Sequence, residues 1–579
     1  MNIASYPRPQ LRRSSFQILD GPWSYHLPSG ESGTILVPYV YQSTASGIGK
    51  PLKGDRIIYE RLFSIPDAWR SQQIRLHFGA SDYYTRVYVN DRMAIYHEGG
   101  QTPFACDIQS LLAPGNEQKL RVEVWDRSAD QRLPRGKQSW RGDGEWIFYR
   151  PSTGIWQSVW MECIPENGVY SLRLTPDVDA GAVRIELEME DACRFPCQAK
   201  ISIFLRGQPV ANASLELQEQ RSSIVLDVFH GKVENGTHFD NGLCWSPETP
   251  TLFDLTVEIL SGGQRCDLIE SYFGMRKISC VGGKLYLNNH PYAQKLVLDQ
   301  GYWPDGLMTP PDPEAFATDI QNAKALGFNG CRMHEKAEDP RFLYQADRLG
   351  FLVWSSMASF YRYDEISASR HLAEWTILLK RDYNHPSIVC WDMLNESWGV
   401  PAIRSDPHQQ RYSVALYSLA HALDGTRPVI SNDGWEMTET DICAVHSYQH
   451  GGPGKPETRQ RFVQALKHVD VLSASGLLEH HAAFAEGYCY RDQPIVLSEF
   501  GGMSLGQGSG WGYENAQDEQ SFLEDYEGLI KAIVNSGLFC GFCYTQLTDV
   551  EQEQNGLMDA QRRFKISPQK IRAIHDLMH

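Results

Sequence analysis

The sequence predicts a chain of three parts, in which two β-sandwiches precede a (β/α)8 barrel. Short alternating strand segments without convincing helices fill the first part, and a second run of strands has the length of one immunoglobulin-like domain. Strands then alternate with helices to the end of the chain. We place a jelly roll at residues 1–165, an immunoglobulin-like sandwich at 166–279 and the barrel at 280–579. Length alone would suggest about four domains.

The first two parts are predicted from strand signals and turn residues. In the jelly roll, β-type runs are separated by clusters of Gly, Pro, Asn and Asp, and Asn90-Asp91 is one such turn signal. The runs lie at residues 74–78, 85–89, 119–125 and 155–162, and in the second part at 183–189, 199–205, 223–228 and 252–260. Residues 165–168 read as the linker between the two sandwiches.

The barrel is predicted from eight strands with helices between most of them. Asp312 and Pro313 begin the first helix, and Asp339 and Pro340 begin the second, which Gly350 ends. Later helices are expected at 410–423 and 519–535. The expected strands lie at 294–298, 328–333, 351–354, 388–394, 428–431, 442–445, 494–497 and 541–544. An open, doubly wound sheet is the alternative fold.

The composition excludes several classes of protein. A hydrophobic fraction of 42% and a charged fraction of 22% are ordinary for a globular chain, and the net charge of −17 argues against a nucleic-acid partner. No apolar run approaches the roughly 20 residues of a membrane helix, so we expect no membrane partner. The polar N-terminus lacks a signal sequence, and the 13 cysteines are scattered, so we expect a cytoplasmic protein. Aromatic residues make up 11% of the chain, which fits core packing and also stacking on sugar rings.

Two glutamates follow predicted barrel strands at positions where burying a charge is costly unless it has a partner or a catalytic role. Glu396 follows the fourth strand in WDMLNESWG, and Glu499 follows the seventh in IVLSEFGG. The carboxyl ends of barrel strands form the active-site face, and strands four and seven lie across the mouth from each other. A single such glutamate would more often cap a helix or pair with an arginine. A facing pair predicts glycosidic bond cleavage, in which one carboxyl donates a proton and the other stays ionised.

The two motifs, LNESWG and LSEFGG, resemble those of glycoside hydrolase family 2, the retaining exo-acting β-glycosidases. The resemblance extends over the whole chain. The segments YVNDRMAIYHEGGQTPF (88–104) and TGIWQSVWME (153–162) are similar to the family's sugar-binding jelly roll. The segments FGMRKISCVGGKLYLNNHPY (273–292) and GFNGCRMHEKAEDPRFLYQADRLGFLV (327–353) are similar to its junction with the barrel and to its second and third strands.

The resemblance implies roles for individual residues. It makes Glu396 the general acid/base and Glu499 the nucleophile, and it assigns Asn395 to the sugar 2-hydroxyl. Arg332 and His334, at the end of the second strand, match an Arg and a His of the family's subsite.

Further binding residues are expected around the same mouth. Tyr448 in VHSYQH matches the family tyrosine that hydrogen-bonds the nucleophile. His446, two residues earlier, shares its face of the strand, although a satisfied core histidine is as good a reading. Asp299 follows the first strand and could bind sugar hydroxyls. Four mouth-loop tryptophans are candidates for stacking on sugar, with packing under a loop as the alternative for each: Trp303, Trp398, Trp435 and Trp511.

The resemblance leaves the sugar open. Residues 551–557 lack the Asn-x-Lys of glucuronidases and are acidic, and residues 354–357 lack the metal-binding groups of the large magnesium-dependent β-galactosidases. We therefore expect no metal, no cofactor and a small glycoside or oligosaccharide substrate with a neutral glycone. A β-galactoside is the best choice, and arabinopyranosides, β-glucuronides or other family 2 substrates are alternatives.

Two alternatives from other classes remain, a non-catalytic carbohydrate-binding protein and a metal-dependent barrel hydrolase. A metal-dependent hydrolase is expected to carry His-x-His after the first strand, whereas residues 296–299 here are Leu-Val-Leu-Asp, which argues against it. Homo-oligomerisation is left open.

Overall fold

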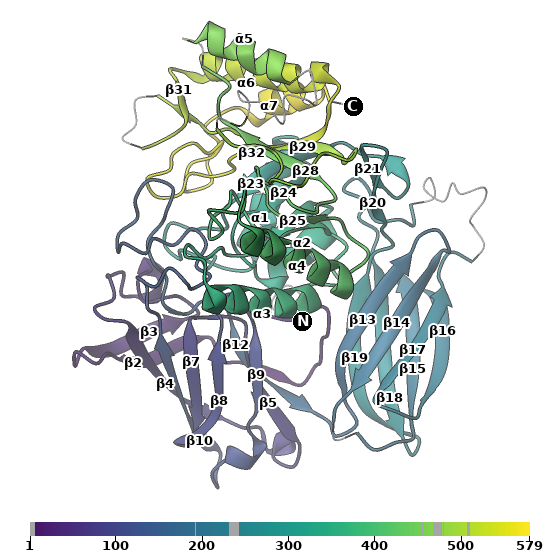
Figure 1. Ribbon diagram of the computed structural model, residues 1–579. Helices are drawn as coiled ribbons and strands as arrows, with labels where there is room; N and C mark the ends of the chain where they lie inside the picture. The colour runs from purple at the N-terminus through teal and green to yellow at the C-terminus, as the bar shows by residue number, and fades with distance from the viewer. Residues whose placement is uncertain are drawn as a thin grey trace.

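The computed structural model describes residues 6–191, 193–230, 242–452, 455–466, 478, 480–506 and 510–578. It places a barrel above two β-sandwiches (Figure 1), which confirms the predicted fold class. No helix in these ranges is long and apolar enough to cross a membrane.

The jelly-roll part consists of two antiparallel sheets around one apolar core. The sheets have the strand orders β1-β12-β5-β9 and β3-β2-β4-β10-β7-β8. The expected strand at 155–162 is divided into β11 and β12, and β11 pairs with β6 instead of joining either large sheet. The strands are β1 (Phe16–Ile18), β2 (Gly21–His26), β3 (Ser32–Val37), β4 (Arg56–Ser64), β5 (Gln73–Phe78), β6 (Ser81–Asp82), β7 (Tyr84–Val89), β8 (Arg92–Glu98), β9 (Phe104–Asp107), β10 (Glu117–Trp125), β11 (Gly154–Ile155) and β12 (Val159–Ile164).

The second part is a sandwich of a three-stranded and a four-stranded sheet, with orders β13-β14-β17 and β16-β15-β18-β19. Its strands alternate buried and exposed residues, as expected where one face of each sheet covers a core. They are β13 (Val169–Asp177), β14 (Ala182–Met189), β15 (Cys197–Leu205), β16 (Gln208–Leu217), β17 (Arg221–Asp227), β18 (Phe253–Ser261) and β19 (Gln264–Phe273).

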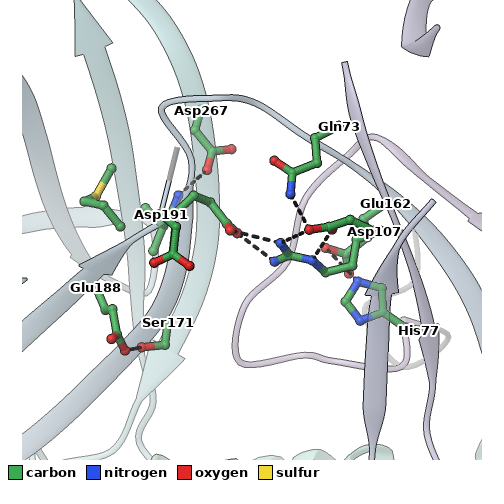
Figure 2. Close-up of polar contacts among 12 residues, drawn as sticks. Gln73, His77, Asp107, Glu162, Ser171, Glu188, Asp191 and Asp267 are labelled. Carbon is green, nitrogen blue, oxygen red and sulfur yellow. Dashed lines mark hydrogen bonds and ion pairs between the residues drawn. The ribbon is translucent and has the colours of Figure 1, made fainter. Parts of the chain in front are cut away.

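Charged side chains join the two sandwiches. Arg75 on β5 binds Asp107 within the jelly roll and Glu190 across the junction, at 2.9 and 2.8 Å. Arg13 pairs with the buried Glu162 on β12 at 3.4 Å and with Asp267 on β19 at 2.8 Å. Figure 2 shows this junction, with Glu162 and Asp107 on the jelly-roll side facing the sandwich strands that carry Asp267. The two sandwiches are thus held in a defined relation beneath the barrel.

The barrel strands pair in the parallel order β27-β26-β25-β24-β23-β32-β29-β28. Pairing of β23 with β32 continues the sheet past the first strand, and a bridge between Gly434 and Val445 joins its two ends. The open doubly wound alternative is therefore wrong. The strands are β23 (Gln294–Asp299), β24 (Gly330–Met333), β25 (Leu352–Ser356), β26 (Ile388–Asp392), β27 (Val429–Ile430), β28 (Cys443–Ser447), β29 (Ile495–Gly501) and β32 (Phe539–Thr545).

The helices begin close to where the sequence predicts. Asp339 caps α2 and Gly350 ends it with φ 70°. The first helix, α1, begins at Glu314 instead of Pro313, yet Asp312 still accepts hydrogen bonds from the amides of residues 314 and 315 at 2.9 and 3.0 Å. The helices are α1 (Glu314–Ala325), α2 (Pro340–Leu349), α3 (Glu365–Arg381), α4 (Pro407–Leu423), α5 (Pro456–Ala465), α6 (Glu519–Ser536) and α7 (Pro568–His575).

Small sheets complete the fold beside the barrel. The strands β20 (Ile278–Val281), β21 (Lys284–Leu287) and β22 (His290–Pro291) lead from the sandwich into β23. Two short strands, β30 (Met503–Leu505) and β31 (Glu514–Ala516), pair in the loop after β29.

Candidate active site

The carboxyl ends of β26 and β29 bring Glu396 and Glu499 together at the mouth of the barrel. A carboxylate oxygen of each glutamate and a ring nitrogen of His446 all lie within 4.8 Å of one another. Both glutamates line one pocket, together with Asn395, Tyr448 and Trp398. The pair that was predicted from two distant motifs is therefore a single site.

An unusual backbone conformation presents Glu396 to this pocket. Glu396 and Ser397 both have positive φ, 50° and 57°, which non-glycine residues rarely adopt. The Glu396 amide donates to the Asp433 carbonyl at 2.8 Å, and the Ser397 amide donates to the Asn432 side chain at 3.1 Å. Strain of this kind persists where surrounding contacts fix it, and it concentrates at functional sites.

Glu499 lies within β29 and accepts a hydrogen bond on each carboxylate oxygen. The Arg332 guanidinium donates to Oε1 and the Tyr448 hydroxyl donates to Oε2, both at 2.7 Å. Burial raises the pKa of Glu499, as does the nearby Glu396, while His446 and Arg332 oppose this rise. Two donors on two oxygens leave little room for a proton, so the contacts suit a carboxylate that reacts in its ionised form.

Arg332 is the centre of a buried charge network beneath the glutamates. Its side chain is fully buried, and its Nε lies 2.8 Å from Asp392 and 2.6 Å from Asp433. Burial raises the pKa of Asp392 to about 8. Burial also acts on Asp433, but Arg332 and His446 outweigh it and lower the pKa to about 2. Of the two aspartates, Asp433 is therefore the ionised partner of Arg332, and Asp392 is close to neutral at neutral pH.

His446 connects this network to the two glutamates. Its Nδ1 lies 2.8 Å from Glu396 Oε1 and 3.6 Å from Glu499 Oε2, and its Nε2 lies 3.2 Å from Asp433 Oδ1. Burial acts to lower the pKa of His446, but the surrounding carboxylates outweigh burial and raise this pKa to about 10. The hydrogen bond and charge of His446 in turn bring the pKa of Glu396 below its usual value despite its burial. The ring acts as a cation between two carboxylates.

Arg332 also orients the two predicted sugar-binding residues beside Glu499. Its Nη2 donates to Asn395 Oδ1 at 2.8 Å, so the Asn395 amide group is left to donate into the pocket. Its Nη1 lies 3.0 Å from His334 Nδ1, and burial together with Arg332 lowers the pKa of His334. A neutral His334 that accepts at Nδ1 carries its proton on Nε2 and can donate to a ligand.

Aromatic rings from two domains form one wall of the pocket. Trp398 is half-buried there, and its ring packs edge-on against Tyr361 and against Phe148 of the jelly-roll part, at 5.5 and 5.7 Å. Tyr513 stacks on Tyr448 at 3.5 Å and also lines the pocket.

The structure does not bring the other three predicted tryptophans into this pocket. Trp303 lies in the packed core of the barrel, where the Arg562 guanidinium covers its ring at 3.8 Å. Trp435 stacks on His481 at 4.0 Å and Trp511 packs against Tyr513 at 4.6 Å, and neither lines the pocket. Packing under a loop therefore describes these three better than the stacking role that their position in mouth loops suggested.

Asp299 is also withdrawn from the pocket. It is buried, and its carboxylate accepts the Gly301 amide at 2.9 Å. The next residue, Gln300, lines the pocket instead.

Sequence reasoning missed the residues that reach the pocket from the jelly-roll part. Lys137, Ile147 and Phe148 lie in the long connection between β10 and β11 and line the pocket. Nothing in their local pattern signals a site, because a loop's place in another domain's pocket depends on how the domains dock. Glu335 and Glu553 of the barrel were missed as well.

Glu396, His446 and Glu499 form the one group of possible metal ligands in the described ranges. Glu396 is already hydrogen-bonded to His446, and Glu499 already accepts from Arg332 and Tyr448. A protonated His446 would also repel a metal cation. These residues fit a pair of catalytic carboxylates better than a metal centre.

Three family models match most of the chain. They are the sugar-binding domain of glycosyl hydrolases family 2 at residues 21–161, the family 2 domain itself at 169–276, and the family 2 TIM barrel domain at 312–579.

Relatives and solved structures carry several activities in their names. A beta-galactosidase of Thermoanaerobacter pseudethanolicus is 24% identical over 64% of this chain and 47% of its own length. A beta-glucuronidase of Paenibacillus borealis is 23% identical over 82% of this chain and 79% of its own length. The chain spans about half the length of the first of these relatives.

The same architecture occurs in solved structures. A b-glucuronidase from Ruminococcus gnavus in complex with uronic deoxynojirimycin superposes with a TM-score of 0.77 at 18% identity, covering 99% of both chains. A GH2 beta-galacturonidase from Eisenbergiella tayi gives 0.75 at 18% identity, again over 99% of both chains. These structures share the fold, and the family models together extend over all three parts of the chain. The chain belongs to glycoside hydrolase family 2.

Proposed function

We propose that the protein is a retaining, exo-acting β-glycosidase in which Glu499 is the nucleophile and Glu396 the general acid/base. The observation that carries this proposal is that one carboxylate oxygen of Glu396 and one of Glu499 lie within 4.8 Å of each other in one pocket. Retaining glycosidases hold their carboxyl groups about 5–5.5 Å apart, whereas inverting enzymes leave about 6.5–9.5 Å for a water molecule.

The contacts of each glutamate support the division of roles. Glu499 accepts from Arg332 and Tyr448, which hold one oxygen toward the anomeric carbon and stabilise the negative charge before attack. Glu396 is hydrogen-bonded through Oε1 to His446. The proton that His446 and Glu396 share can move along this hydrogen bond onto Glu396 and pass to the glycosidic oxygen as the bond to the anomeric carbon breaks.

The second half of the reaction uses the same groups in reverse. Glu396, now a carboxylate, takes a proton from water, and the water oxygen attacks the anomeric carbon and releases Glu499. Asn395 donates its amide to the 2-hydroxyl, a hydrogen bond that strengthens in the transition state. The sugar leaves with the configuration it had at the start.

The glycone that we favour is β-galactose. Glu553 lines the pocket and accepts from Tyr149 at 2.6 Å, and Glu551 pairs with Arg150. Both lie in the strand-eight segment where glucuronidases of the family usually place a lysine, and the Glu553 carboxylate in the pocket opposes a uronate. The relatives include beta-glucuronidases, so β-glucuronide is the second candidate.

A panel of nitrophenyl α- and β-glycosides, assayed with and without EDTA, tests the proposal. We expect hydrolysis of a β-glycoside that EDTA does not change, with the β-anomer of the free sugar seen first by NMR. An α-anomer at early times would exclude the retaining mechanism. Binding of sugars without hydrolysis of any glycoside would instead favour a non-catalytic carbohydrate-binding protein.

A further inference from the structure

Lys137 brings an ammonium group from the jelly-roll part into the barrel's pocket. The residue is 7% exposed and lines the pocket with Glu396 and Glu499. Within the described ranges its Nζ makes no direct hydrogen bond or ion pair, and the ring centroids of Phe148 and Tyr149 lie 5.9 and 5.6 Å from it. An ammonium group has three protons to donate, so those of Lys137 are available to an acceptor that a ligand brings into the pocket.

The backbone fixes where Lys137 stands. The amides of Arg135 and Gly136 both donate to the Ser359 carbonyl at 3.0 Å, and the Tyr149 amide donates to the Lys137 carbonyl at 2.7 Å. Gly136 has φ 56°, and a Cβ there would lie 2.3 Å from the Glu335 carbonyl oxygen. The loop is therefore pressed against the barrel at the residue that precedes Lys137.

Glu335 offers a complementary group in the same pocket. It is 4% exposed, its φ is 49°, and its Oε2 accepts from the Tyr361 hydroxyl at 3.3 Å. Its Oε1 is buried without a hydrogen-bond donor. Burial raises the pKa of Glu335 to about 7. The pocket thus holds one group with protons to donate, Lys137, and one carboxyl oxygen without a donor, Glu335 Oε1.

We propose that Lys137 and Glu335 form a clamp for hydroxyl groups of a neutral sugar and so select neutral glycosides over uronides. A hydroxyl oxygen accepts from Lys137 Nζ, and a hydroxyl proton is donated to Glu335 Oε1, so one sugar hydroxyl or a vicinal pair satisfies both groups. Where a neutral sugar places its C6 hydroxyl between these two groups, a uronate places a carboxylate, which accepts from Lys137 but has no proton for Glu335 and is repelled by its charge. The clamp rests on the proposed function, because it concerns the sugar bound between the two catalytic glutamates.

Matched substrates test the clamp. Nitrophenyl β-D-galactoside is compared with β-D-galacturonide, and β-D-glucoside with β-D-glucuronide, so that each pair differs only at C6. Lys137→Met keeps the aliphatic stem and removes the donor, Glu335→Gln keeps the shape and removes the charge, and Lys53→Met at an exposed position is the control. Thermal unfolding of each variant shows that it folds.

We expect the wild type to prefer the neutral member of each pair. Lys137→Met and Glu335→Gln should each reduce kcat/KM on the neutral substrate by about 10- to 100-fold, whereas Lys53→Met should leave it unchanged. With the wild type, a deoxy-galactoside that lacks the clamped hydroxyl should have a lower kcat/KM than the galactoside. With Lys137→Met, removing the same hydroxyl should change kcat/KM little, because its partner is already gone. A wild type that prefers uronides and loses that preference in Lys137→Met would overturn the clamp and make Lys137 a carboxylate-binding residue.

A binding measurement separates failure of the clamp from failure of the proposed function. If the wild type cleaves no glycoside, calorimetric titration with D-galactose and D-glucuronate still reports on the pocket. Galactose binding that weakens about tenfold or more in Lys137→Met would support the clamp without catalysis. Equal binding of galactose by wild type and variant would reject it.

Discussion

Nδ1 of His446 lies 2.8 Å from Oε1 of Glu396, so the proposed acid/base shares a hydrogen bond with an imidazole. Carboxylates surround this ring, since Asp433 faces Nε2 and Glu499 lies 3.6 Å from Nδ1. They raise the pKa of His446 to about 10, although burial acts in the opposite direction. One proton is therefore held by the histidine and glutamate as a pair, and moving it along the hydrogen bond creates the acid that the reaction needs.

We predict that His446→Gln moves the alkaline limb of kcat/KM to lower pH. The pair in the wild type keeps its proton until the pH approaches the pKa of about 10. A lone carboxyl at position 396 would release its proton at a lower pH, so the acid form of the variant is lost earlier. Beyond that point the activity of the variant should fall about tenfold for each pH unit.

The pH profile is measured on a nitrophenyl glycoside that the wild type cleaves. His421→Gln is a suitable control, because His421 pairs with Asp441 at 2.8 Å on the partly exposed side of α4. If His446→Gln lowers the rate equally at every pH, the ring only positions Glu396 and does not hold its proton.

We predict that the two glutamates respond differently to the leaving group. Glu499→Ala removes the nucleophile and should reduce kcat by about 10⁴-fold or more on every substrate. Glu396→Ala should cost about 10²- to 10⁴-fold with a poor leaving group such as methanol, and far less with dinitrophenolate, which departs without a proton. Azide should restore turnover in Glu396→Ala and give a β-glycosyl azide.

Steady-state kinetics on a series of aryl and alkyl glycosides measure this difference. Glu439→Ala is the control, since that carboxylate pairs with Arg491 near the surface. Equal losses for Glu396→Ala across the whole series would mean that Glu396 is not the proton donor.

The two glutamates that we propose as the catalytic pair could be predicted to share one pocket because their sequence signals are local. Each follows an apolar strand within a motif of a few residues, and the barrel rule places strand ends on one face. The partners of these glutamates carry weaker signals. Asp392 and Asp433 lie in buried segments, and their attachment to Arg332 depends on register among three strands. Lys137 could not be found at all, because it lies in another domain and its place follows from docking.

The helix starts of the barrel, like the two glutamates, were predictable because their sequence signals are local. Asp339 followed by proline is a start signal that works through one hydrogen bond, from the Arg341 amide to the Asp339 carboxylate at 2.8 Å. Strand ends were less accurate. The fourth strand ends at Asp392, two residues before the expected Leu394, because the chain there turns to present Glu396 and pairs with the loop after β27.

We predict that the two aspartates around Arg332 differ in their contribution to stability. Burial raises the pKa of Asp392 to about 8, so this group is largely protonated at neutral pH and Asp392→Asn should change the free energy of unfolding by less than about 1 kcal/mol. The pKa of Asp433 is about 2, so Asp433→Asn removes the ionised partner of a fully buried guanidinium and should cost about 3–5 kcal/mol.

Urea unfolding of both variants at neutral pH compares the two costs directly. Both substitutions replace Asp with Asn beside the same arginine, and the cost of Asp433→Asn also includes the loss of the charge that faces His446 Nε2 at 3.2 Å. A larger loss for Asp392→Asn than for Asp433→Asn would show that the ionic partner of Arg332 had been assigned to the wrong aspartate.

Gly136 lies at the contact between the jelly-roll part and the candidate active-site pocket. Gly136 is placed where a Cβ would lie 2.3 Å from the Glu335 carbonyl, and its φ of 56° disfavours any other residue. Gly136→Ala should therefore lift the loop from the barrel and displace Lys137 from the pocket, which should raise KM about tenfold. Gly142, in the same loop, also has positive φ, 109°, but a Cβ there meets nothing within 4 Å. Gly142→Ala should consequently keep KM within about twofold of the wild type, and equal effects of the two variants would mean that backbone strain, and not the contact with Glu335, governs the pocket.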